Sequence, residues 1–101
     1  MEVKEVTIDE AKKNLDGGTA VFIDVRDHGS FSQSHIDSAT SLDDTNIEEY
    51  IANCDKDKMH IIYCYHGNSS KGAAAYFNSK GIKNSFSMKG GYAEWEDTFS
   101  K

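Results

Sequence analysis

The sequence contains no proline and only two cysteines among its 101 residues. Without proline the unfolded chain is less restricted than usual, so folding has more backbone freedom to order. The two cysteines, Cys54 and Cys64, allow at most one disulfide. Small secreted domains that depend on disulfides for their stability usually have more. Together with the four histidines they form no recognisable ligand pattern for zinc. We therefore expect two free thiols in a reducing compartment, and no metal or other cofactor.

Long apolar stretches and positive charge are also scarce. The longest apolar run is far too short to span a bilayer, and residues 1–5 lack the apolar core of a secretion signal, so we expect a cytoplasmic protein with no membrane partner. The formal net charge is −6. This disfavours a nucleic acid as partner, because phosphate binding needs a surplus of Lys and Arg on one face. A site for an anion has to be local, built from backbone dipoles and a nearby cation.

Segments typical of strands and helices alternate along the chain. Hydrophobic residues make up 38% and charged residues 28%, which suits a soluble globular protein, and the length suits one domain. Strands are expected over residues 3–6, 19–25, 37–42, 59–63 and 84–88. The strongest of these are apolar throughout, which indicates burial on both faces of a parallel sheet. We predict a single α/β domain over residues 1–101, with a mostly parallel central sheet of about five strands flanked by helices on both faces.

Start and stop signals place the helices between these strands. The capping-box pattern of residues 7–10 begins a helix that Gly17 and Gly18 end. A second such pattern, residues 45–48, begins a helix with an apolar stripe at Ile47, Tyr50 and Ile51. A helical turn is expected over 30–34 with Asp27 as its cap, and longer helices over 70–80 and 92–99.

The most informative segment runs from Cys64 to Gly72. The apolar strand 59–63 leads directly into Cys64, small and polar residues follow, and an alanine-rich helix comes next. The thiol therefore lies between the end of a buried strand and the start of a helix, where backbone N–H groups converge and favour negative charge. In parallel sheets, ligands bind beyond the carboxyl ends of the strands. This pattern indicates a reactive thiolate rather than a packing residue.

The residues after Cys64 suit a loop that turns its N–H groups toward the sulfur. Gly67 and Asn68 tolerate positive φ angles, and Ser69 or Ser70 can cap the following helix. The combined dipoles would lower the thiol pKa from about 8.5 into the neutral range. The same N–H groups would hold the oxygens of a bound anion.

The side chains around Cys64 leave several roles open. Lys71 either attracts an anionic substrate or is an exposed lysine that opposes the helix dipole. Ser69 either donates its hydroxyl to the sulfur or to an oxyanion, or serves the turn alone. His66 could act as a base, but we expect it to point outward and shape the entrance. Cys54 is interpreted as a packing residue. Structural or exposed positions are expected for the remaining histidines, His28, His35 and His60.

Three motifs, spread over most of the chain, together resemble a known family. The first is Asp24-Val25-Arg26, followed by Ser34-His35-Ile36 and Ala39; the second runs from Cys64 to Ala74; the third is Gly90-Gly91-Tyr92-Ala93-Glu94-Trp95. They resemble the rhodanese family, and specifically its single-domain GlpE-type thiosulfate sulfurtransferases. The sequence departs from that family at Ser34, where Gly is common, and at Asp37-Ser38, which replaces a small or proline-containing turn. These departures affect the expected turn geometry rather than the chemistry.

The resemblance implies a rhodanese-like fold and a two-step sulfur transfer. The Cys64 thiolate would take the outer sulfur of thiosulfate, release sulfite, and pass the persulfide sulfur to cyanide or a thiol. Cys64 would be catalytic, and the substrate would be bound by the loop residues Tyr65, His66, Gly67, Asn68, Ser69 and Lys71. Asp24 and Arg26 are expected to brace the domain through hydrogen bonds, and Trp95 is expected in the core.

Three alternatives to a free sulfurtransferase remain at this point. A cysteine phosphatase or arsenate reductase would need Arg six positions after the cysteine, where this chain has Ser70. A non-enzymatic rhodanese-like module often lacks the cysteine, which is present here. A persulfide carrier that serves a protein partner such as thioredoxin would keep the chemistry and change only the acceptor.

Overall fold

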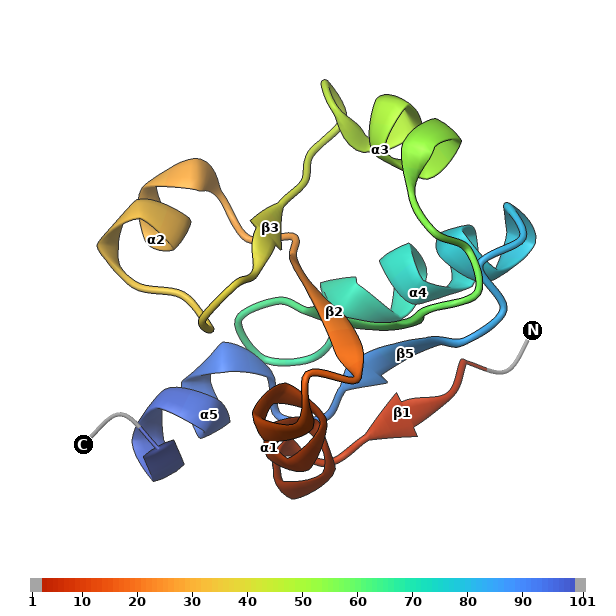
Figure 1. Cartoon of the computed structure of the whole chain (residues 1–101). Coiled ribbons are helices and arrows are strands. Elements are labelled where there is room, and N and C mark those ends of the chain that lie inside the picture. Colours follow the sequence, from red (N-terminus) through yellow and green to blue (C-terminus); the bar gives the residue numbers. More distant parts are fainter. Residues whose placement is uncertain (1–2, 100–101) are drawn as a thin grey trace.

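The computed structural model describes residues 3–99, which form five strands and five helices (Figure 1). In chain order these are β1 (Glu5–Val6), α1 (Ile8–Gly17), β2 (Ala20–Asp24), α2 (His28–Gln33), β3 (Thr40–Ser41), α3 (Ile47–Asn53), β4 (Met59–Tyr63), α4 (Ser69–Ser79), β5 (Ser85–Met88) and α5 (Gly91–Phe99). The predicted alternation of strands and helices is confirmed. Among the described residues, no helix combines the length and hydrophobicity that a membrane span requires.

The strands form one sheet in the order β1-β5-β4-β2-β3, and every pairing is parallel. β4 lies at the centre, with Asp24 of β2 in register with Tyr63. Because all strands run the same way, their carboxyl ends share one edge of the sheet. Cys64 directly follows the central strand at that edge, so the predicted fold class and the predicted position of the thiol are both confirmed.

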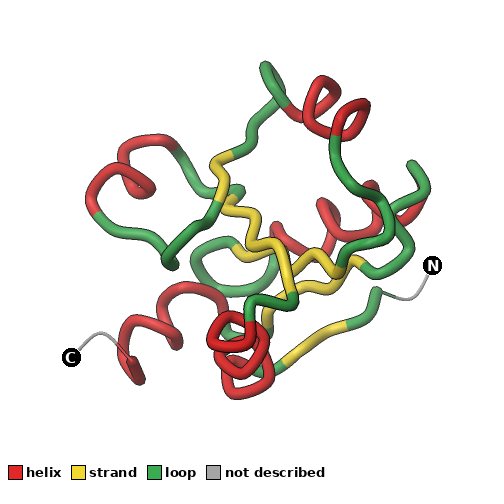
Figure 2. The backbone as a smooth tube through the Cα atoms, viewed as in Figure 1, coloured by secondary structure: helices red, strands yellow, loops and turns green. Residues whose placement is uncertain are grey.

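Side chains that alternate along the strands form two separate core clusters, one on each face of the sheet. The helices that cover these faces lie on both sides of the sheet in Figures 1 and 2. On one face Phe22 and Ile61 pack with residues of α1 and α5, including Trp95. On the other face Ile23 and Ile62 pack with residues of α3 and α4. Helices therefore cover both faces, as predicted, and Trp95 is a core residue with 5% of its surface exposed.

The first helix begins and ends as its sequence predicts. The Thr7 hydroxyl accepts the N–H of Glu10, the Glu10 carboxylate accepts the N–H of Thr7, and Gly18 closes the helix with φ 66°. The shorter α2 also has the predicted cap, since the Asp27 carboxylate accepts the N–H of Ser30.

The second capping-box prediction, at Thr45 and Glu48, is wrong. The helix starts from Asn46, and the Asp43 carboxylate accepts both the N–H and the hydroxyl of Thr45. The Glu48 carboxylate instead accepts the hydroxyl of Tyr76 from α4. A partner from a neighbouring helix thus replaces the local one, which a pattern of four residues does not reveal.

The strand expected over residues 37–42 is reduced to Thr40–Ser41 by a turn. Ala39 donates its N–H to the carbonyl of Ile36, and Ser38 adopts φ 66°, the only positive φ angle of a non-glycine residue among residues 3–99. A side chain in this left-handed region costs about 1–2 kcal/mol. This turn, with its left-handed residue, lies at the position where the sequence departs from the family pattern.

We expect Ser38→Gly to stabilise the protein, because glycine adopts positive φ without steric cost. The gain in the free energy of unfolding should be about 1 kcal/mol after the extra freedom of glycine in the unfolded chain is subtracted. Urea unfolding of the variant beside the parent measures it. The same change at Ser79, the last residue of α4, serves as the control and should destabilise, because it removes a hydrogen bond to the carbonyl of Tyr76. An equal loss of stability at both positions would contradict strain at Ser38.

Candidate active site

The loop after β4 wraps its N–H groups around the sulfur of Cys64. The N–H of Gly67 lies 3.1 Å from Sγ and the N–H of Ser70 lies 3.3 Å from it. Cys64 is buried, with 6% of its surface exposed. Gly67 has φ 96°, whereas Asn68 has φ −88°, so glycine alone supplies the expected left-handed residue. The predicted turning of the loop toward the thiol is present in the structure.

Two buried serine hydroxyls form a chain of contacts that ends at the sulfur. Ser70 Oγ lies 3.4 Å from Cys64 Sγ and 2.7 Å from Ser87 Oγ of β5, and both serines are fully buried. When the sulfur is a thiolate, the Ser70 hydroxyl can donate to it while accepting from Ser87. Nothing in the sequence singles out Ser87, because its role depends on β5 lying beside β4.

The expectation that Ser69 or Ser70 caps α4 is wrong. Asn68 is the N-cap residue, and no side chain makes a capping hydrogen bond there. Ser70 lies inside the first turn, where Sγ of Cys64 takes its N–H in place of a side-chain oxygen. Ser69 is exposed, so the hydroxyl beside the sulfur belongs to Ser70 and not to Ser69.

These contacts favour the charged form of the thiol. Burial raises the pKa of Cys64, but hydrogen bonds from the side chain and backbone of Ser70 and from the backbone of Gly67 and His66 outweigh it. The pKa of Cys64 therefore lies below the ordinary value of a thiol. Because the thiolate is the nucleophilic form of cysteine, the geometry activates this residue.

The carbonyl groups of the same loop are held by the first N–H groups of α5. Tyr92 donates to the carbonyl of Cys64 at 2.8 Å, and Ala93 donates to that of Tyr65 at 2.9 Å. A Cβ atom on Gly91 would lie 2.5 Å from the Tyr65 oxygen and 2.7 Å from the Cys64 oxygen. Gly91, the first residue of α5, is therefore required for the close approach of this helix to the loop. The sequence does not reveal this role, because it depends on which loop α5 meets.

The remaining predicted loop residues surround the mouth of the site. Tyr65, His66 and Asn68 are exposed, and the rings of Tyr65 and His66 lie 5.0 Å apart. No hydrogen bond joins the imidazole of His66 to the sulfur, which agrees with the outward orientation we expected. Lys71 is half exposed and lies 3.8 Å from the Glu5 carboxylate of β1, so it is held on the β1 side of α4.

Asp24 and Arg26 brace the domain as predicted. The guanidinium donates to both carboxylate oxygens of Asp24, which is fully buried, and to the carbonyl of Ser34 at 2.7 Å. It also lies 4.1 Å from the ring centre of Tyr92. This cluster connects the end of β2, the end of α2 and the first turn of α5.

The other cysteine and the remaining histidines lie outside the site. Cys54 is partly buried against the core on the α3 and α4 face, as predicted. His60 is buried and bonded to the Tyr50 hydroxyl, while His28 and His35 are exposed. Within residues 3–99 no group of three or more Cys, His, Asp or Glu side chains is arranged to hold a metal ion.

Comparison with known families agrees with this geometry. The family described as "Rhodanese-like domain" matches residues 7–98, nearly the whole chain. The chain belongs to the rhodanese family. Among curated relatives, the thiosulfate sulfurtransferase GlpE of Pseudomonas fluorescens (strain Pf0-1) is 40% identical over 98 residues, covering 97% of this rhodanese and 89% of that protein. The protein of the same name from Pseudoalteromonas translucida (strain TAC 125) is 36% identical, covering 100% of this chain and 96% of its own.

Solved structures share the fold of this rhodanese at lower identity. The human single-domain sulfurtransferase TSTD1 superposes with a TM-score of 0.85 at 19% identity, covering 96% of this chain and 98% of its own. A rhodanese-like domain protein from Staphylococcus aureus gives 0.83 at 24% identity, covering 96% and 95%. The rhodanese-like fold is thereby shown.

We expect Ser70→Ala to raise the pKa of Cys64, because the variant loses a hydroxyl that favours the thiolate. The midpoint of the pH profile for alkylation by iodoacetamide should move upward by about one pH unit. The matched control is Ser69→Ala, whose exposed hydroxyl makes no bond to the sulfur. Equal midpoints in the two variants would show that the Ser70 hydroxyl does not tune the thiol.

Proposed function

We propose that this rhodanese is a thiosulfate sulfurtransferase that acts as a single domain, with Cys64 as its nucleophile. The observation that carries the proposal is the ring of hydrogen-bond donors from Gly67 and Ser70 around a buried thiol of lowered pKa. Curated relatives that are 36% and 40% identical over nearly the whole chain carry the name thiosulfate sulfurtransferase, and they support it.

In the first step the Cys64 thiolate attacks the outer sulfur of thiosulfate. A new S–S bond forms to Cys64, the S–S bond of thiosulfate breaks, and sulfite leaves with the electron pair. The enzyme keeps a persulfide anion, whose charge the N–H groups of Gly67 and Ser70 stabilise as they do that of the thiolate. No external oxidant or cofactor is needed, because the reaction only transfers a sulfur atom.

In the second step a thiophilic acceptor attacks the terminal sulfur of the persulfide. Cyanide forms a C–S bond and leaves as thiocyanate, while the electron pair of the S–S bond returns to Cys64 as the thiolate. A thiolate acceptor gains the sulfur in the same way and becomes a persulfide itself. The two half-reactions predict ping-pong kinetics.

We assign substrate binding to the loop from Tyr65 to Ser69 together with Lys71. Its backbone N–H groups surround the reacting sulfur, Tyr65 and His66 form the exposed rim, and Lys71 supplies positive charge on the β1 side. The acceptors proposed are cyanide, small thiols or a protein thiol such as thioredoxin, and the proposed compartment is the cytoplasm.

The geometry favours sulfur transfer over the two other functions considered. At the position where a cysteine phosphatase carries Arg, this chain has Ser70, whose hydroxyl is directed at Sγ and Ser87 rather than at a bound phosphate. A non-enzymatic module would not require a thiol with four donating contacts that lower its pKa.

Cys64→Ala should abolish sulfur transfer from thiosulfate to cyanide, since no other thiol lies at the loop. Intact-mass analysis after incubation with thiosulfate should show a gain of about 32 Da for the parent, equal to one sulfur, and none for the variant. Cys54→Ala is the control and should keep both the mass gain and the turnover. Persistent activity in Cys64→Ala would overturn the mechanism.

Lys71→Ala should raise the KM for thiosulfate more than it lowers kcat, because a half-exposed cation assists binding of the dianion rather than the chemistry. The rise should be about twofold to fivefold and should shrink at high salt. Lys83→Ala serves as the control. It removes the same charge just before β5, where the amino ends of the strands lie and far from the carboxyl ends that carry the loop. A KM that changes equally in both variants would return Lys71 to the role of an exposed lysine.

A further inference from the structure

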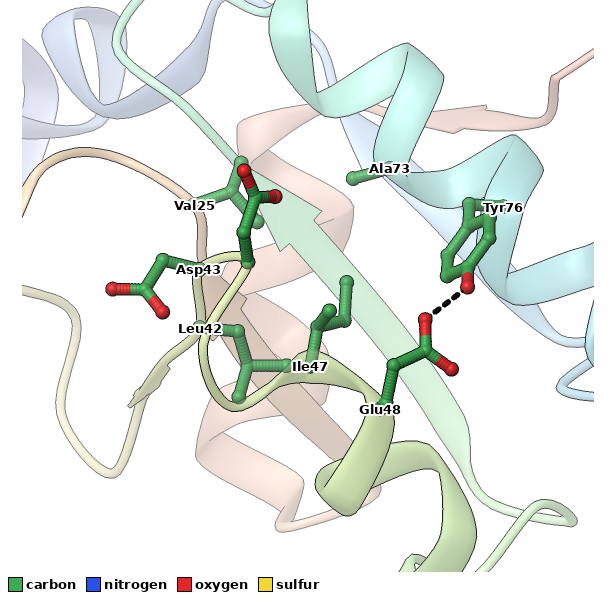
Figure 3. A pocket seen from close by; sticks show the side chains of 8 residues that line it. Val25, Leu42, Asp43, Ile47, Glu48, Ala73 and Tyr76 are labelled. Atoms are coloured by element: carbon green, nitrogen blue, oxygen red, sulfur yellow. Dashed lines mark hydrogen bonds between the residues drawn. The ribbon is translucent and has the colours of Figure 1, made fainter.

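A groove of about 540 Å³ lies between the end of β2, the segment after β3, and helices α3 and α4 (Figure 3). Aliphatic and aromatic side chains form most of its wall: Val25, Leu42, Ile47, Ala73 and Tyr76. Its volume is enough for a few side chains of a partner, within the range of ordinary ligand pockets. The mechanism proposed above uses none of these residues.

The groove opens at the same edge of the sheet as Cys64. Val25 follows β2 and donates its N–H to the carbonyl of Tyr63 at 3.0 Å, one residue before the catalytic cysteine. Ala73 lies one turn after Ser69, the first residue of α4. A molecule seated in the groove is therefore beside the loop that carries the sulfur.

The remaining wall is acidic, and none of the eight lining residues is basic. Asp44 is exposed and makes no hydrogen bond or ion pair with the described residues, and Glu48 accepts the hydroxyl of Tyr76 across the groove (Figure 3). Hydrogen bonds from Thr45, and then from His28, lower the pKa of Asp43 to about 2. The Asp43 side chain turns away from Tyr76 in Figure 3, so it adds negative charge to the wall without facing Tyr76 across the groove.

This charge disfavours small anionic substrates in the groove. Thiosulfate is a dianion and the nucleophilic form of cyanide is an anion, and the carboxylates of Asp44 and Glu48 repel both. The positive charge near the loop lies elsewhere, since Lys71 is held at Glu5 on the β1 side of α4. The groove therefore fits a positively charged occupant, which would be held beside the loop that carries the sulfur.

We propose that the groove docks a protein sulfur acceptor through a segment in which an aliphatic side chain is flanked by Lys or Arg. The aliphatic side chain packs against Val25, Ile47 and Ala73, and the cations face Asp44 and Glu48. An apolar centre with a charged rim is the usual anatomy of a protein interface. The proposal rests on the proposed function, because it names the acceptor class of that same site.

Sulfur transfer to designed peptides tests this directly. The chain is loaded with thiosulfate, freed of excess, and mixed with the peptide Arg-Ile-Cys-Ile-Arg, with Glu-Ile-Cys-Ile-Glu, or with cyanide. The rate of persulfide loss is followed for each. The basic peptide should react faster than the acidic one by about threefold to tenfold, and high salt should reduce the difference. Equal rates for the two peptides would overturn the proposal.

Matched variants distinguish an effect of docking in the groove on the transfer rate from an effect of the protein's overall charge. Asp44→Lys and Ala73→Gln should each lower the ratio of the basic-peptide rate to the cyanide rate by about threefold or more, the first by charge and the second by filling the groove. Glu49→Lys makes the same change of charge on α3 outside the groove and should leave that ratio near the parental value. Equal effects of Asp44→Lys and Glu49→Lys would show a diffuse field and no docking site.

A binding measurement distinguishes failure of the docking from failure of the proposed chemistry. Amide shifts are recorded by NMR while Arg-Ile-Ser-Ile-Arg, which accepts no sulfur, is added to the protein. Shifts centred on residues 42–48 and 73–76, and lost in Asp44→Lys, support the proposal even if no persulfide forms. Absent or scattered shifts contradict it. Dimerisation that Asp44→Lys abolishes, seen by sedimentation, would assign the groove to a second copy and also overturn it.

Discussion

The site depends on a division of the loop backbone into two sets of polar groups. The carbonyls of Cys64 and Tyr65 accept the first N–H groups of α5, and this leaves the N–H groups of Gly67 and Ser70 to face the sulfur. A buried backbone group needs a partner, so turning the loop over would leave both sets unsatisfied at once. The activated thiol near the middle of the chain is therefore held in place by its last helix, and Gly91 is what allows that helix to come close.

The Asp24 and Arg26 pair supports the same arrangement from the other side. The guanidinium of Arg26 contacts the ring of Tyr92, whose N–H holds the Cys64 carbonyl, and it bonds to the carbonyl of Ser34. Replacing a buried ion pair with apolar residues often leaves stability unchanged, so we attribute the role of this pair to position rather than to stability. It fixes α5 relative to β2, and through α5 it fixes the loop. The first and third sequence motifs thus act on the second, although neither touches the sulfur.

The sequence predicted the parts of the site that depend on local order and missed those that depend on which strands are neighbours. Apolar strands and helix signals placed Cys64 at the end of a central strand, and Gly67 indicated the direction of the loop. The Ser70 hydroxyl was not assigned to the sulfur, and Ser87 was not assigned to Ser70, because Ser87 meets that hydroxyl only when β5 pairs with β4. The capping box at Thr45 failed for the same reason, since Glu48 found its partner on another helix.

An acidic protein can stabilise an anionic sulfur because the groups that contact the sulfur differ from the charged groups that set the long-range electrostatic field. The groups around Sγ are N–H and O–H dipoles without formal charge, so they stabilise a thiolate or persulfide at contact distance and do not attract anions from afar. Long-range attraction would come only from charged side chains such as Lys71, while Asp44 and Glu48 set a negative field on the other side of α4. A site built this way favours the anionic form of its sulfur inside an acidic protein. Under the docking proposal, the choice of acceptor belongs to the surface beside the loop rather than to the loop itself.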